Sequence, residues 1–219
     1  SKGSHIRDGI DLKRTMGMVV MALVPALLFG MWNVGNLHAA SIGETWTLWE
    51  MFGYGLVRMI PLIAVSYIVG LGIEFVFAQI RGHEINEGFL VSGMLIPLIV
   101  PIDVPLWMVA IATAFAVIIG KEVFGGTGMN IVNPALTARA FLFFAYPGDM
   151  SGDKVWVSGL SGGEGVIDAF SGATPLANAA SGTMEKLPSV FEMLIGNYPG
   201  SIGETSTIAI ALGAIILLF

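Results

Sequence analysis

Long apolar runs separated by short polar segments dominate the chain. The first run, residues 15–34, follows a basic segment, and the second, residues 54–78, ends shortly before Arg81. Each is near the roughly 20 residues that a membrane-spanning helix needs. The connection, residues 35–53, has glutamate and tryptophan but no lysine or arginine. The pattern therefore predicts two spanning helices, with residues 1–14 as a cytoplasmic lead-in and the connection in the periplasm.

Three shorter apolar runs follow, at residues 88–100, 106–120 and 134–146. At 1.5 Å per residue they reach only about 20–23 Å, less than the roughly 30 Å hydrocarbon core. The break between the first two contains Pro101, Asp103 and Pro105. We therefore predict half-helices, which are tolerated where other helices cover their free backbone groups. Either all three cross the membrane, or one crosses and the other two form a re-entrant pair.

The remaining chain divides into a long polar loop and a short apolar end. Residues 147–203 are rich in glycine, serine and acidic residues, which favours a periplasmic loop. Residues 204–219 are too short to span, so we expect them to begin a truncated transmembrane helix of a longer chain. The predicted fold is an all-α polytopic membrane protein, with residues 15–146 as one unit of helices and half-helices.

Composition supports this fold and narrows the chemistry. The chain is 55% hydrophobic and 12% charged, whereas about a quarter of the residues of a soluble domain are charged. It contains no cysteine, so its own thiolates cannot hold an iron–sulfur cluster and any redox role needs an organic cofactor or a partner. A net charge of −6 without a basic tract argues against nucleic acid as a partner.

A threonine in the long loop has unusually small neighbours. Ser171, Gly172 and Ala173 leave room around the hydroxyl of Thr174, and Pro175 favours extended geometry at Thr174. No histidine, cysteine or lysine lies near it in sequence to act as a base, so Thr174 is a poor candidate for a self-contained nucleophile. The pattern indicates a site where a group is attached to the protein; an ordinary Ser/Thr turn is the alternative.

Several ionisable residues lie within or beside the apolar runs: Arg58, Glu74, Lys121, Glu122 and Arg139. Each would cost several kcal/mol at membrane depth unless it is paired or hydrated, which makes these residues functional candidates. Snorkelling to the interface is the alternative for Arg58 and Lys121.

Two further positions have polar groups beside breaks in the helices. Asp103, with the free carbonyls around it, could coordinate Na+, although a helix cap would explain it equally well. Asn130 and Asn133 flank a bend before Pro134 and could hydrogen-bond a planar polar ring such as an isoalloxazine. Turn formation is the alternative for these two amides.

Three stretches carry a family resemblance: residues 5–8 (HIRD), 82–89 (GHEINEGF) and 125–147 (GGTGMNIVNPALTARAFLFFAYP). With the threonine motif, they closely resemble the family of B subunits of the sodium-translocating NADH:quinone oxidoreductases, more than the related D subunits of Rnf complexes. Asp168, followed by Ser171-Gly172-Ala173-Thr174, is similar to the motif at which a bacterial flavin transferase joins FMN to threonine through a phosphoester.

The resemblance implies a urea-transporter-like fold of inverted repeats, of which this chain holds the first repeat and the start of the second. It implies covalent FMN on Thr174 and riboflavin in the vicinity of Asn130 and Asn133. It also implies ubiquinone near Gly70 and Glu74, although the family often has paired glycines where this chain reads Gly70-Leu71-Gly72.

The implied function is that of a multi-pass subunit of a respiratory complex in the bacterial inner membrane. A periplasmic FMN-carrying partner subunit would supply electrons, which would pass through FMN and riboflavin to ubiquinone with coupled Na+ translocation. Maturation would need the flavin transferase. A channel or secondary transporter for a small polar solute is the alternative, and it predicts no bound flavin. A structural anchor for redox partners is a third interpretation.

Overall fold

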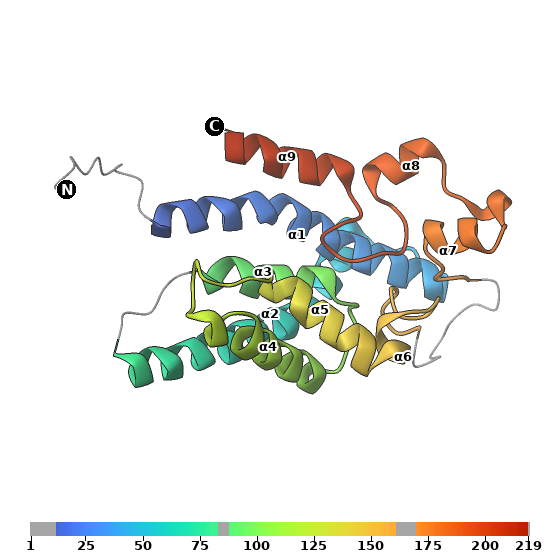
Figure 1. The fold of residues 1–219 in the computed structure, drawn as a ribbon. Coiled ribbons are helices and arrows are strands. Elements are labelled where there is room, and N and C mark those ends of the chain that lie inside the picture. The colour runs from blue at the N-terminus through green and yellow to red at the C-terminus, as the bar shows by residue number, and fades with distance from the viewer. Residues whose placement is uncertain (1–11, 83–87, 161–169, 219) are drawn as a thin grey trace.

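The computed structural model describes residues 12–82, 88–160 and 170–218, and these residues form helices and no strand (Figure 1). The α-helices are α1 (Leu12–Ile42), α2 (Leu48–Arg81), α3 (Phe89–Ile99), α4 (Leu106–Gly120), α5 (Pro134–Ala145), α6 (Pro147–Met150), α7 (Pro175–Ala180), α8 (Val190–Ile195) and α9 (Thr207–Leu218). Three stretches of the described part are long and apolar enough to cross a membrane: α1, α2, and α4 together with the turn that follows it. The predicted class, an all-α polytopic membrane protein, is confirmed.

Helices α1 and α2 are antiparallel, and their backbones touch (Figure 1). A Cβ atom at Gly55 would lie 1.8 Å from the carbonyl oxygen of Met31, and one at Gly35 would lie 2.0 Å from that of Met51. Small residues allow membrane helices to approach this closely without strain. The two glycines therefore fix where the two long helices cross.

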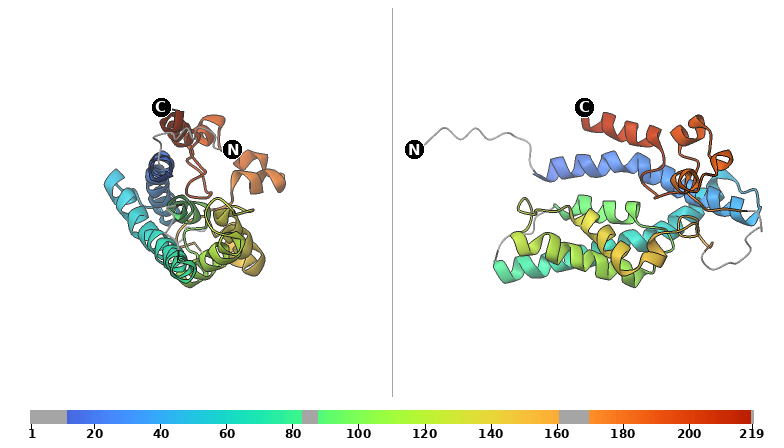
Figure 2. Two further views of the ribbon diagram at one scale, coloured as in Figure 1. Left: turned by 60° about the vertical axis from the view of Figure 1, so that its left-hand side comes forward. Right: turned by 45° about the vertical axis from the view of Figure 1, so that its right-hand side comes forward.

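Helix α3 lies in the middle of the bundle, against α1, α2 and α5 (Figure 2). Its side chains Phe89 and Ile96 are fully buried, and so is Val100 just beyond its end. At 11 residues, α3 is about 16 Å long, and the 12-residue α5 is about 18 Å long. Both are half the length of a spanning helix, as the sequence predicted.

The chain reverses direction at each step from α3 to α4 to α5, so residue 147 lies at the opposite end of the molecule from Arg81 (Figure 1). Both topologies expected from the sequence, three crossings or one crossing with a re-entrant pair, place these two positions on opposite sides of the membrane. The connection between α1 and α2 lies at the same end as α6, α7 and α8.

Two predicted boundaries are wrong. Residues 35–53 are not a loop, because α1 continues to Ile42 and α2 begins at Leu48. The missed signal is a capping box, in which the backbone N–H and the hydroxyl of Thr47 both donate to the Glu50 carboxylate, each over 2.8 Å. The polar end of α1 stays helical while its side chains bind other segments, as in the 2.7 Å hydrogen bond from Asn36 to Asn197.

The half-helix expected at residues 106–120 has the predicted bounds, Leu106–Gly120, but a further helical turn follows it. A 3-10 turn, Glu122–Phe124, extends α4, and the continuous 19 residues Leu106–Phe124 are long and apolar enough to cross a membrane. The apolar run stops at Lys121, but Lys121 and Glu122 are both buried. Lys121 is the C-cap of α4, and the two buried charged residues connect α4 to the 3-10 turn.

The long loop returns into the core before α9 begins. Ile202 is only 4% exposed, and its carbonyl oxygen lies 2.4 Å from where a Cβ of Gly30 would be. The N–H of Gly203 donates to the carbonyl of Leu98 in α3 over 2.9 Å. The predicted external loop therefore has an internal end, which packs between α1 and α3.

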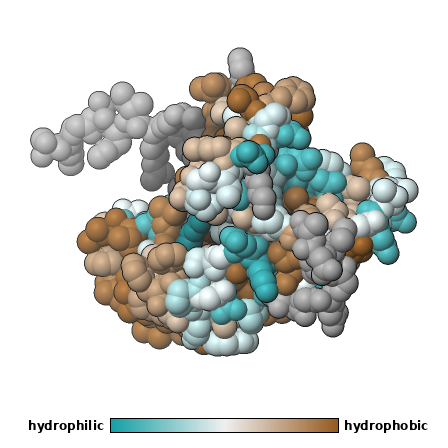
Figure 3. All heavy atoms as spheres, turned by 90° about the vertical axis from the view of Figure 1, so that its right-hand side faces the viewer, coloured by the Kyte–Doolittle hydropathy of each residue, from teal (hydrophilic) through white to brown (hydrophobic). Residues whose placement is uncertain are grey.

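The end of the molecule that carries α6, α7 and α8 is polar near its centre (Figure 3). Hydrophilic residues gather there, and hydrophobic residues lie toward the lower left of the same view. Along α2, by contrast, apolar side chains face outward, with Ile60, Ile68 and Val76 at least half exposed. This distribution is typical of helices whose sides contact lipid and whose ends contact water.

The α1–α2 contact predicts opposite effects for two glycines of one helix. Gly55→Ala should lower the stability by about 1–3 kcal/mol, because the new methyl group overlaps the Met31 carbonyl. Gly53→Ala, where nothing lies within 4 Å of the new atom, should be neutral or stabilising by about 0.5–1 kcal/mol. Thermal unfolding in detergent measures the stability of both variants. Equal losses of stability would contradict the close contact of α1 and α2 at Gly55.

Candidate functional site

Thr174 stands at the start of α7, and the residue is half-buried. Its backbone is extended, with φ −69° and ψ 156°, and Pro175 is the first residue of the helix. The hydroxyl oxygen accepts a hydrogen bond from the N–H of Ala177 over 3.2 Å. The prediction from Pro175 is therefore confirmed, and the hydroxyl also acts as a helix cap.

A cavity of about 410 Å³ opens beside Thr174. Its walls come from segments far apart in the chain: Arg139 on α5, Trp156 in the loop after α6, and the segment from Tyr198 to Thr205 before α9. Arg139 forms an ion pair with Glu204, with 3.4 Å between Nη1 and Oε2. The fold thus brings a cation predicted at membrane depth to the predicted attachment residue.

Tyr198 and Thr205 contribute polar groups to the lining of this cavity. The hydroxyl of Tyr198 donates to the carbonyl of Thr205 over 3.0 Å. Burial and the nearby Glu204 carboxylate raise the pKa of Tyr198 above its ordinary value, so the phenol is protonated at neutral pH. The Oγ1 atom of Thr205 is buried without a hydrogen-bond partner, and such a group costs free energy until it gains one.

The small residues before Thr174 have a packing role that sequence reasoning missed. A Cβ on Gly172 would lie 2.2 Å from the carbonyl oxygen of Asp153 and 2.7 Å from Leu160. Ser171 is exposed, and its hydroxyl accepts weakly from the N–H of Ala173 at 3.4 Å. Gly172 thus lets the Thr174 segment pack against the loop after α6. Asp168 lies outside the described residues.

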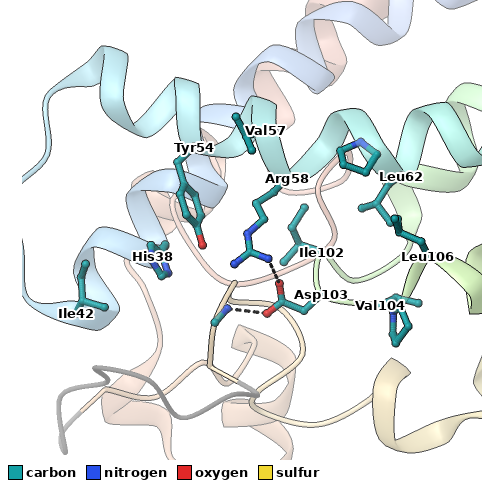
Figure 4. Close-up of a pocket in the computed structure, with 13 residues that line it drawn as sticks. His38, Ile42, Tyr54, Val57, Arg58, Leu62, Ile102, Asp103, Val104 and Leu106 are labelled. Atoms are coloured by element: carbon teal, nitrogen blue, oxygen red, sulfur yellow. Dashed lines mark hydrogen bonds and ion pairs between the residues drawn. The ribbon is translucent and has the colours of Figure 1, made fainter.

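A second and larger cavity, of about 950 Å³, lies between the ends of α1, α2 and α4 at the same end of the molecule (Figure 4). Arg58 reaches from α2 toward Asp103, with 3.9 Å between Nη1 and Oδ1. The Asp103 carboxylate also accepts from the N–H of Gly159 at 2.6 Å and from the hydroxyl of Ser158 at 3.0 Å. Asp103 therefore anchors the loop after α6.

The helix-cap interpretation of Asp103 is wrong, because α4 begins after Pro105 without a side-chain cap. Its role on a Na+ path stays a prediction. In the part of the chain that the structure describes, no cluster of three or more histidine, cysteine or acidic residues could hold a metal ion.

His38 and Tyr54 complete the larger cavity, and sequence reasoning missed both. Their rings stack with 4.3 Å between centroids, and the guanidinium of Arg58 lies 5.5 Å from the centre of the Tyr54 ring. His38 Nδ1 is 2.7 Å from the carbonyl of Ser158. These contacts hold Arg58 in the cavity, and its side chain is 47% exposed, as expected for a residue near the membrane surface.

The other end of the molecule holds buried charges. Glu74 on α2 forms an ion pair with Lys121, and both side chains are about 95% buried. Arg81 pairs with Glu122 at 3.4 Å and donates to the Glu122 carbonyl at 2.6 Å. The snorkelling interpretation of Lys121 is therefore wrong.

The two residues predicted to lie near ubiquinone have packing roles in this region. A Cβ at Gly70 would lie 1.9 Å from the ring of Phe89, so the glycine makes room for a fully buried aromatic side chain. Glu74 lies one helical turn further along α2 and is bound by Lys121. A role of either residue in binding quinone stays a prediction.

Asn130 and Asn133 are exposed and have local hydrogen bonds. The amide of Asn130 donates to the carbonyl of Val132 at 3.1 Å. Asn133 caps α5 by accepting from the N–H of Ala135 at 2.9 Å. The alternative interpretation, turn formation, fits these local hydrogen bonds, and the cap role of Asn133 was not predicted. The proximity of the two residues to riboflavin stays a prediction.

Comparison with known proteins gives one consistent result. A family model described as the NQR2, RnfD, RnfE family matches residues 1–219. Curated relatives named as the B subunit of Na(+)-translocating NADH-quinone reductase occur in Ectopseudomonas mendocina, Azotobacter vinelandii and Chromohalobacter salexigens, at 47%, 45% and 43% identity. Each alignment covers 98% of this chain and 56–58% of the relative. The chain thus spans somewhat more than half the length of these proteins.

The buried ion pair predicts strong coupling between Glu74 and Lys121. Lys121→Met should destabilise the protein by about 3–5 kcal/mol, because it leaves the Glu74 carboxylate buried and unpaired. Adding Glu74→Gln should recover most of the loss. Unfolding midpoints of the two single variants and the double variant test this, and purely additive effects would show that the pair is not a unit.

Proposed function

The chain belongs to the NQR2, RnfD, RnfE family, and on that premise we propose that it is part of the B subunit of a Na+-translocating NADH:quinone reductase. In this proposal Thr174 carries covalent FMN, and the subunit passes electrons through FMN and riboflavin to ubiquinone with coupled Na+ movement. The complex lies in the bacterial inner membrane, with a periplasmic FMN-carrying subunit as the electron donor. The names of the relatives support the complex, and the Thr174 cavity supports the cofactor.

The observation that carries the proposal is the cavity beside the Thr174 hydroxyl. Its volume of about 410 Å³ is within the range of small-molecule sites, about 300–1,000 Å³. It has a cation in Arg139, an unsatisfied hydroxyl in Thr205, and aromatic walls in Trp156 and Tyr198. These groups fit a phosphate and a planar ring. FMN, when bound, supplies electron transfer that the side chains of a cysteine-free chain do not provide.

Attachment is a phosphoryl transfer in which Thr174 supplies the oxygen. The bond from Oγ1 to phosphorus would form as a phosphoanhydride bond of a flavin dinucleotide breaks, with a nucleoside monophosphate as the leaving group. The hydroxyl proton needs a base, and in this cavity the carboxylate of Glu204 is bound by Arg139 and Ser201. In this proposal the base is supplied by the separate flavin transferase, whose recognition motif the segment from Asp168 to Thr174 resembles.

The proposed relay runs along the length of the molecule. Thr174 lies at the end that carries α7, whereas the bend with Asn130 and Asn133 and the C-terminal part of α2 lie toward the other end (Figure 1). We assign riboflavin to the vicinity of the two asparagines and ubiquinone to the region of Gly70 and Glu74. The spatial order supports electron entry at one membrane face and quinone reduction at the other.

Coupling to Na+ follows from electrostatics at low dielectric. An added electron inside the membrane favours the approach of a compensating cation, because charges interact strongly where water is excluded. The chain has carboxylates at both ends of the bundle, Asp103 at one and Glu74 and Glu122 at the other. We propose these three carboxylates as points on the Na+ path.

A solute channel or secondary transporter remains the second candidate, since both cavities and the half-helices suit transport. Transport of a solute does not explain why Arg139 lines the same cavity as Thr174, a threonine preceded by small residues. The two functions differ in whether the protein carries flavin.

The proposal predicts one FMN-sized mass increment on the full-length protein from a host that has the flavin transferase. Thr174→Val should abolish the increment, because valine keeps the shape and lacks the hydroxyl. Thr183→Val is the matched control, since Thr183 is an exposed hydroxyl in the same loop, bonded to the Asn178 carbonyl. Intact mass and in-gel flavin fluorescence measure all three proteins.

Two outcomes would contradict the proposal. If the wild type carries no increment while the transferase modifies a control protein, the flavin assignment fails and transport becomes the better function. If Thr183→Val removes the increment and Thr174→Val retains it, the attachment residue is wrong.

A further inference from the structure

We propose that Arg139 is the counter-ion of the phosphodiester on Thr174, and that it exchanges its partner Glu204 for this group when the flavin is attached. The inference rests on the proposed function and adds to it a residue, on a different helix, that holds the cofactor. It also gives Glu204 a role as the partner that keeps Arg139 in position beforehand.

Arg139 has the charge and position for this role. Among the described residues that line the Thr174 cavity, it is the only one with a positively charged side chain. A phosphodiester has one negative charge at neutral pH, and the planar fork of a guanidinium binds phosphate oxygens with two hydrogen bonds. An arginine on α5, set in the packed bundle, provides a rigid anchor for a group on a loop.

The ion pair with Glu204 is suited to exchange. The Arg139 and Glu204 side chains are 35% and 56% exposed, and ion pairs this exposed to solvent contribute little to stability. Glu204 has a second partner in the Ser201 hydroxyl, so its carboxylate stays hydrogen-bonded after Arg139 moves away. A phosphodiester close to Glu204 would also repel it, since like charges in a partly enclosed site disfavour each other.

The remaining walls of the cavity suit the rest of the flavin. Trp156 and Tyr198 offer aromatic surface for a planar ring. The Thr205 hydroxyl, which is 2% exposed and has no partner, can gain a hydrogen bond from a polar edge of the ligand. With Arg139 on the phosphate, the ring is confined between these groups instead of moving freely on the loop.

The test uses the assembled complex from a host with the transferase and compares Arg139→Gln, Arg139→Lys and Glu204→Gln with the wild type. Intact mass reports attachment. Time-resolved fluorescence anisotropy reports how freely the attached flavin rotates, with the signal of a Thr174→Val complex subtracted to remove other flavins. Arg139→Gln and Glu204→Gln both break the same ion pair, but only the first removes the counter-ion.

We expect the Arg139 and Glu204 variants to retain the mass increment. In Arg139→Gln the population of freely rotating flavin should rise about ten-fold or more, since a hydrogen bond to a charged group shifts an equilibrium by that order. Arg139→Lys should lie between, because it keeps the charge without the fork. Glu204→Gln should hold the flavin as firmly as the wild type.

The outcomes separate this inference from the proposed function. No increment in the wild type overturns both. An increment with identical anisotropy in the wild type and Arg139→Gln overturns only the counter-ion role. If the attached flavin becomes equally mobile in Arg139→Gln and Glu204→Gln, the ion pair acts by stabilising the fold. That result also overturns the counter-ion role of Arg139.

Discussion

A 2.9 Å hydrogen bond from the N–H of Gly203 to the carbonyl of Leu98 joins the segment before α9 to α3 in the middle of the bundle. Leu98 lies in the last turn of a short helix, whose final carbonyls have no partner within the helix. Burying such a group without a hydrogen bond is costly, so a loop that supplies the donor stabilises the break. The next residues of that loop, Glu204 and Thr205, line the Thr174 cavity. The same contact that completes the core therefore builds the candidate site.

The rest of the bundle separates two kinds of polar group. At the end with α7, the charged groups Arg58, Asp103, Arg139 and Glu204 border cavities and are partly exposed. Toward the other end, Glu74 and Lys121 are buried against each other. Partly exposed pairs exchange partners at little cost, whereas buried pairs resist it. The proposed role of Arg139 in holding the cofactor phosphate fits a partly exposed pair, whereas removing one charge of the buried pair would strongly destabilise the protein.

Sequence patterns predicted the helices well where hydrophobicity alone decides, as in the two long helices and the short α3 and α5. They failed where tertiary contacts extend a helix beyond its apolar run. Asn36 stays helical because it binds Asn197. The burial of Lys121 just after α4 depends on its partner Glu74 on α2, which the sequence alone does not show. The local geometry of Thr174 was predictable from Pro175. The cavity was not, because Arg139, Trp156 and Glu204 are distant in sequence and only the returning loop brings them together.

The most direct test of the account is a cryo-electron microscopy map of the flavin-carrying complex at the Thr174 cavity. The account predicts continuous density from the Thr174 hydroxyl oxygen through a phosphate to a planar ring, with the Arg139 guanidinium on the phosphate and Glu204 turned away. Flavin density that extends from Thr174 away from this cavity, while Arg139 is still paired to Glu204, would contradict the account.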